Sequence, residues 1–126
     1  MAVRIVQLGT PRDPAEGLRI GTVRRPPRGV PKREFAKRNF YDAWLPDLSP
    51  TEALRTSIDR ERNWWPAFAR RFKGEMKRPE AARLLDLLAA LSHESDFSVG
   101  CYCEDEARCH RSVLKELLEA RGAKLG

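Results

Sequence analysis

Thiol, imidazole and guanidinium side chains gather in residues 101–112, which read CYCEDEARCHRS. The apolar run from Phe97 to Cys103 predicts a buried strand before this segment, and the spacing of apolar residues over 113–118 predicts a helix after it. In parallel α/β sheets, ligands bind beyond the carboxyl ends of the strands. The free N–H groups at the start of a helix favour an anion. The segment is therefore the first candidate site.

Two interpretations of this segment use its polar groups in different ways. In the first, Cys101 and Cys103 alternate in the strand and pack as small hydrophobic residues, with His110 capping the helix. In the second, Arg108 and Arg111 hold a phosphate or carboxylate in a bidentate fork at the helix start, with Ser112 beside them. The second interpretation makes these three residues candidate ligand-binding residues.

A third interpretation is catalysis by a thiolate. The positive helix end and two guanidinium groups lie next to Cys109, and such surroundings lower the pKa of a thiol. Cys109 or Cys101 is then the candidate nucleophile, and His110 is the candidate acid or base because its ordinary pKa is close to neutrality. The phosphatase pattern of Cys, five residues and Arg is not met, because Cys109 stands six places after Cys103.

A fourth interpretation is a metal site. Three soft sulfur ligands and an imidazole are enough in number for zinc. However, the paired C-x-x-C spacing is missing, and neighbouring Cys109 and His110 are expected to point in different directions on a helix. The prediction is therefore that no metal is bound, with a thiol or metal protein kept as an alternative. No motif indicates a cofactor or an oligomeric state.

A second basic segment, Arg24–Lys32, holds four cations and three prolines in nine residues. Proline removes backbone donors and restricts the chain, so this segment is neither a helix nor a central strand. It is predicted to be a surface loop, with Arg25, Arg28, Gly29 and Lys32 as candidate ligand-binding residues.

The remaining elements predict an α/β fold. Strands are expected at 3–8, 18–23, 40–45 and 97–103, and one or two helical turns at 32–38. Ser49 is expected to cap a short helix that runs to about Ile58, and Asn63 to cap the next. One apolar stripe consists of Trp65, Phe68, Phe72 and Met76. A second consists of Leu84, Leu87, Leu88 and Leu91, with Leu85 widening it, and Arg121-Gly122 closes the last helix. The long helical crossover before the fourth strand favours parallel pairing.

These elements predict a single small domain over residues 1–126, with a mainly parallel sheet of about four strands flanked by helices. Each basic or polar motif then follows a strand, namely after Val23, after Leu45 and after Cys103. If those strands are parallel neighbours, the three loops gather at one edge of the sheet. We expect a cleft there in which Arg25, Arg28, His110 and Arg111 surround an anion and Trp44 supplies a flat wall.

The motifs C-x-C-x-D-x-x-x-C-H-R-S-V-L, RRPPRGVPK and WLPDLSP, taken together and in this order, resemble the YeaO-like family, also called domain of unknown function 488. The resemblance covers nearly the whole chain. It implies a small α/β domain and adds Ser49 and Pro50 to the candidate positions already named. Pro26 stands where the family usually has a tryptophan. The resemblance implies no particular reaction.

Composition narrows the function classes. The chain has 126 residues and a net charge of +6, which permits an anionic or nucleic-acid partner. Three cysteines and no leader-like start favour a reducing, cytoplasmic location, and no apolar run approaches a membrane span. The leading hypothesis is a protein, with or without enzyme activity, that binds a phosphate-bearing or nucleotide-type small molecule. The alternative is a nucleic-acid-binding module. Acidic residues among the cations, as in Asp59-Arg60-Glu61-Arg62, argue against it.

Overall fold

A four-stranded parallel sheet organises the computed structural model, which describes residues 1–59 and 63–126. Its strands are β1 (Val3–Gln7), β2 (Leu18–Gly21), β3 (Ala43–Trp44) and β4 (Phe97–Cys101). They lie in the order β1-β4-β2-β3, and every neighbouring pair is parallel. The predicted α/β class and the parallel pairing are confirmed. The carboxyl ends of β2, β3 and β4 therefore share one edge of the sheet.

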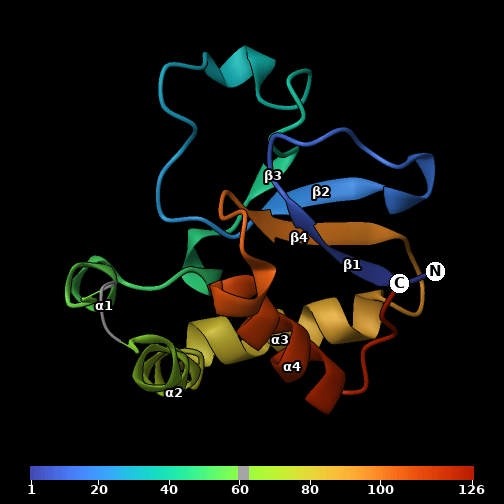
Figure 1. The fold of residues 1–126 in the computed structure, drawn as a ribbon. Coiled ribbons are helices and arrows are strands. Elements are labelled where there is room, and N and C mark those ends of the chain that lie inside the picture. The colour runs from blue at the N-terminus through green and yellow to red at the C-terminus, as the bar shows by residue number, and fades with distance from the viewer. Residues whose placement is uncertain (60–62) are drawn as a thin grey trace.

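The helices of the described part are α1 (Glu52–Thr56), α2 (Trp65–Glu75), α3 (Pro79–Leu91) and α4 (His110–Ala120). In Figure 1 they lie below the sheet, and the long segment between β2 and β3 lies above it. The two chain ends meet beside β1, where Val3 bridges to Leu125. The run 59–62, whose alternating charges predicted a solvated surface, is described only at Asp59.

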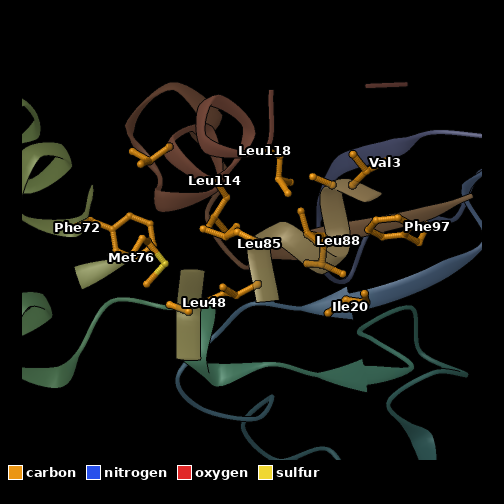
Figure 2. Close-up of a cluster of buried hydrophobic side chains, with 14 of the residues drawn as sticks. Val3, Ile20, Leu48, Phe72, Met76, Leu85, Leu88, Phe97, Leu114 and Leu118 are labelled. Atoms are coloured by element: carbon orange, nitrogen blue, oxygen red, sulfur yellow. The ribbon is translucent and has the colours of Figure 1, made fainter. Parts of the chain in front are cut away.

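The buried apolar residues form two separate clusters. The larger one includes Phe97 and Val99 of β4 together with residues of the helices (Figure 2). Its other members come from every layer and include Val3, Ile20, Leu48, Phe72, Met76, Leu85, Leu88, Leu114 and Leu118. A second, smaller cluster is made of Leu8, Val23, Tyr41, Cys101 and Cys109. The buried cysteines therefore belong to a separate cluster at the carboxyl ends of the strands.

A buried ion pair covers the opposite face of the sheet. The Arg19 guanidinium donates to Glu16 at 2.6 and 3.0 Å and to the carbonyls of Thr10 and Asn39. The Ser98 hydroxyl donates to the same carboxylate at 2.8 Å. Every charged atom of the pair is thus satisfied, which makes burial of the two charges tolerable.

A close approach explains the small residue at the end of β2. A Cβ on Gly21 would lie 2.4 Å from the Tyr41 ring, because this ring occupies the space of a side chain there. The aromatic ring covers the sheet between β2 and the loop that precedes β3. Glycine is therefore required by packing at this position.

Several local predictions differ from the structure. The α1 cap is Thr51, whose hydroxyl accepts from Leu54 N–H, because Ser49 instead donates to the Pro46 carbonyl. The α2 helix begins at Trp65 with no side-chain cap, so Asn63 does not cap it. The third strand is only two residues long.

The apolar stripe of α3 is confirmed in part. Leu85 and Leu88 are buried as expected, together with Ala81 and Ala89, whereas Leu87 and Leu91 are exposed. The buried face therefore includes two alanines that leucine spacing alone does not reveal. By contrast, the close of the last helix is confirmed: Arg121 is its C-cap and Gly122 follows with a φ of 82°.

Candidate functional site

A pocket of about 150 Å³ opens at the carboxyl ends of β2 and β4. Residues from five regions line it: the segment after β2 with the first two arginines of the basic segment, the loop into α1, α1 and the residues that follow it, the start of α2, and the 101–110 turn. The parallel sheet brings these regions together, as predicted from the positions of the motifs. The pocket therefore contains both predicted basic segments in part, and its chemistry depends on which side chains enter it.

The three cysteines form the floor of this pocket. Their sulfur atoms all lie within 4.8 Å of one another. Cys101 ends β4, Cys103 lies two residues beyond it, and Cys109 returns from the far end of the turn. Cys101 and Cys109 are buried, and Cys103 is half-buried. None of these three cysteines is part of a disulfide.

The backbone of Cys109 explains how this sulfur joins the others. Cys109 is the N-cap of α4 and has extended dihedral angles, φ −129° and ψ 148°. It therefore lies outside the helix, and its Sγ comes to 3.7 Å from His110 Nδ1. The prediction that these two neighbours point apart is wrong, because it placed both of them inside the helix.

A backbone carbonyl directly after β2 fixes the position of the His110 ring. Its Nε2 lies 2.6 Å from the Thr22 carbonyl oxygen. A carbonyl only accepts, so Nε2 carries the proton and the neutral ring presents an unprotonated Nδ1 toward Cys109. Burial lowers the pKa of His110 from its ordinary value, so the ring is neutral at pH 7.

The surroundings of the thiols raise their pKa values. The pKa of Cys101 is raised mainly by hydrogen bonding with Cys103 and Cys109, and also by burial. The hydrogen bond from Cys101 lowers the pKa of Cys109, but donation to Cys103 and burial outweigh it and raise that pKa to about 12. Cys101 and Cys109 are therefore protonated at neutral pH, which does not favour either as a free thiolate nucleophile.

Arg111 lies under the turn, outside the set of residues that line the pocket. It is buried, and its guanidinium donates from Nη2 to the Cys103 carbonyl at 2.8 Å. Its Nε has no hydrogen-bond partner. Within residues 1–59 and 63–126 the side chain forms no ion pair. Arg111 therefore supports the turn from beneath and does not reach a ligand in the pocket.

Four other arginines line the pocket. Arg24 donates to the Ser49 and Pro50 carbonyls, each at 3.2 Å, and so ties the basic segment to the loop before α1. Arg25 and Arg55 share one carboxylate, Glu52, at 3.3 and 3.6 Å. Arg108 is exposed, and its guanidinium has no hydrogen bond or ion pair among the described residues, although its backbone N–H donates to the Asp105 carbonyl. Sequence reasoning found Arg25 and Arg108, but it left Arg24 and Arg55 out.

Aromatic side chains form the walls. Trp64, Phe68 and Tyr102 line the pocket, and the Trp64 ring meets the Phe68 ring edge-on at 5.5 Å. The sequence predicted Phe68 for the core, which is correct, since it is also buried. The sequence around Trp64 does not indicate that this residue lines a pocket, because only the placement of α2 in the fold brings it there.

Other predicted residues lie elsewhere. Lys32 and Trp44 line a second cavity beside Tyr41, and Trp44 Nε1 donates to the Val23 carbonyl at 2.7 Å. Neither Arg28 nor Gly29 lines either cavity. Ser112 donates to the Cys109 carbonyl at 2.8 Å and closes the first turn of α4. Of the residues predicted to form one cleft, Arg25 and His110 line the first pocket, whereas Arg28, Trp44 and Arg111 do not.

Comparison with known families gives one match. A model of the family DUF488-N3a, described as the active DUF488-N3 subclade, matches residues 3–122. No curated protein and no solved structure matches the chain. Among the described residues, no helix is both long enough and apolar enough to cross a bilayer.

Proposed function

The chain belongs to the DUF488 family, and we propose that its pocket binds a small anionic ligand, such as a phosphate group or a molecule that carries one. The observation that carries the proposal is that four arginines from three segments line the same pocket. Three of the four come from outside the turn that holds the cysteines. Local sequence does not bring them together, so the fold concentrates positive charge at this place.

The charge balance leaves the pocket cationic. Of the arginines in its wall, two share the single carboxylate of Glu52, and Arg108 has no partner among the described residues. The positive end of the α4 dipole adds to this charge, because α4 begins at His110 on the pocket wall. A guanidinium that is not already paired is the group that gains most from an incoming phosphate or carboxylate.

The size of the pocket limits the ligand. A cavity of about 150 Å³ encloses a molecule the size of benzene. The pocket therefore holds a phosphate group or one small ring, and the rest of a nucleotide would extend toward solvent. The aromatic walls favour a flat apolar part beside the charged one. Inorganic phosphate and a nucleoside monophosphate are accordingly the first probes.

The test is calorimetric titration of Arg108→Gln with inorganic phosphate and then with a nucleoside monophosphate. A hydrogen bond to a charged group contributes about 1.5–3 kcal/mol, so we expect affinity to fall about 10- to 150-fold. Arg83→Gln is the matched control, because Arg83 is an exposed arginine on α3 and its loss changes the net charge equally. Equal affinities for the two variants would contradict the proposal.

Nucleic-acid binding is the alternative function, and the ion pairs on the surface argue against it. Exposed cations on several elements already have acidic partners, as in Lys73 with Glu116 and Arg121 with Asp86. Such pairing interrupts a continuous basic stripe. The two functions differ in their salt response: binding to an oligonucleotide falls steeply with added salt, because several phosphates are neutralised at once. A strong, salt-sensitive affinity for oligonucleotides with none for small phosphates would favour the alternative.

A further inference from the structure

We infer that the cysteines on the pocket floor form a zinc site. Cys101, Cys103 and Cys109 bind one Zn²⁺ ion as thiolates, and His110 Nδ1 is the fourth donor. This inference does not rest on the proposed anion binding, since it uses the floor of the pocket and the anion proposal uses its arginine-lined wall. It also reverses the expectation from sequence that no metal is bound.

The distances between the sulfurs suit a tetrahedral ion, and His110 Nδ1 lies close to one of them. With Zn–S bonds of about 2.3 Å and a Zn–N bond of about 2.0 Å, ligand sulfurs are about 3.8 Å apart and sulfur and nitrogen about 3.5 Å apart. The three sulfurs lie within 4.8 Å of one another, and Cys109 Sγ lies 3.7 Å from His110 Nδ1. The sulfurs need to close by about 1 Å at most. Cys103 lies beyond the end of β4, in a turn that can supply this movement.

The orientation of His110 is that of a metal ligand. In most metal sites the second ring nitrogen donates to a carbonyl or carboxylate, which fixes the tautomer and directs the first nitrogen at the ion. Here Nε2 donates to the Thr22 carbonyl at 2.6 Å, and Nδ1 is left without a proton next to the thiols. The ring is also packed edge-on against Phe72 at 5.5 Å, so its direction is set before any ion arrives.

A buried positive charge lies beside the cluster without a counter-ion. Arg111 is 4% exposed, donates to the Cys103 carbonyl, and forms no ion pair among the described residues. An unpaired buried charge is costly. Three thiolates and one Zn²⁺ carry a net charge of −1, which balances this guanidinium. The metal-bound state therefore removes an electrostatic cost that the metal-free state retains.

The ion has a route and a balanced reaction. All three cysteines and His110 line the same pocket, so Zn²⁺ enters from solvent through it. On binding, the three thiols lose their protons to solvent and three Zn–S bonds form, and no redox step is involved. The chain contains three cysteines in total, so every thiolate bound to an added metal belongs to this cluster.

The first experiment measures zinc in competition with a chromophoric chelator, under reducing conditions. The expected result is one equivalent of Zn²⁺ per chain. Mutating a residue that only hydrogen-bonds to a metal ligand lowers metal affinity roughly 10- to 100-fold. Cys103→Ser removes a ligand itself, so we expect a larger fall in zinc affinity. Cys103 is half-buried in a turn, so this variant should fold, and its circular dichroism checks this. His93→Ala is the control, because His93 is exposed and its ring hydrogen-bonds to the Gly122 carbonyl, which is not part of the proposed zinc site.

The second experiment adds Co²⁺ to the unaltered protein and records its absorption spectrum. A thiolate-to-cobalt charge-transfer band is expected. In His110→Ala this band should persist with weaker binding, since the thiolates remain. The inference is overturned if the unaltered protein shows no such band, or if Cys103→Ser and His93→Ala bind zinc equally. Neither result depends on the outcome of the phosphate titration, which uses metal-free protein and Arg108.

Discussion

Glu16→Gln is expected to destabilise the fold strongly, because it removes the charge that balances buried Arg19. The side chains meet at 2.6 and 3.0 Å, and both are almost fully buried. Removing one partner of a buried pair costs about 3–5 kcal/mol. Glutamine keeps one oxygen for the Arg19 and Ser98 donors, but it places an N–H₂ group against the guanidinium. We therefore expect about 3 kcal/mol, at the lower end of this range.

Urea unfolding followed by circular dichroism measures this loss. With a denaturant slope of about 1–3 kcal/mol/M, the midpoint should fall by at least about 1 M. Asp86→Asn is the control, because it also removes a carboxylate bonded to an arginine, Arg121, at 2.8 Å, but at an exposed position. Exposed pairs contribute about 0–1 kcal/mol. The reasoning is refuted if Glu16→Gln costs no more than Asp86→Asn.

The same pair predicts a pH dependence with a definite sign. Burial alone would raise the pKa of Glu16, but the hydrogen bonds from Arg19 and Ser98 together outweigh it and lower the pKa. The stabilisation is therefore fully present above the unfolded-state pKa, about 4.3, and is lost as pH falls through the lower folded-state value. The stability difference between the unaltered protein and Glu16→Gln should accordingly shrink in acid. A difference that grows as pH falls would contradict the assignment.

Three further substitutions test the packing by urea midpoint. Leu85→Ala removes a fully buried side chain and should cost about 2–5 kcal/mol of stability. Leu87→Ala, at an exposed position on the same helix, should cost much less. Equal losses would show that the buried face of α3 is assigned wrongly. Gly21→Ala puts a Cβ 2.4 Å from the Tyr41 ring, so we expect a loss of about 1–3 kcal/mol, and an unchanged midpoint would mean that the ring moves freely. Thr51→Ala removes the α1 cap and also the hydrogen bond from the Thr51 hydroxyl to Glu75, so we expect a loss of at least about 0.5–2 kcal/mol, and an unchanged midpoint would contradict the assignment of this cap.

Local patterns in the sequence predict much of the fold. The apolar runs that become β1, β2 and β4 are continuous in sequence, and the stripe of α2 repeats at helical spacing, so short-range chemistry is enough to recognise them. The order of elements then restricts the topology, because a long helical crossover joins parallel strands. The same reasoning places the basic segment and the cysteine turn at one edge of the sheet, and the structure confirms this for Arg25 and Arg108.

Local patterns fail where burial depends on distant residues. Arg19 is charged, yet it is buried, because the distant Asn39 carbonyl and the Glu16 carboxylate accept from its guanidinium. Arg111 is also buried, although only its Nη2 donates, to the Cys103 carbonyl. Leu87 is apolar, yet it is exposed, because α3 turns a different face toward the core. In each case the side chain's own chemistry does not say which neighbours will surround it.

The sequence by itself determined which reactive groups this protein has: three thiols, two imidazoles and an excess of cations, spaced around strands that must be parallel. Only the tertiary structure decided which of them meet. Cys109 joins Cys101 and Cys103 because its extended backbone precedes α4 and turns its sulfur back over the end of β4. Arg55 and Trp64 reach the same pocket because helix packing carries them there. Contacts of this kind depend on rigid-body placement of whole elements, which spacing along the chain does not encode.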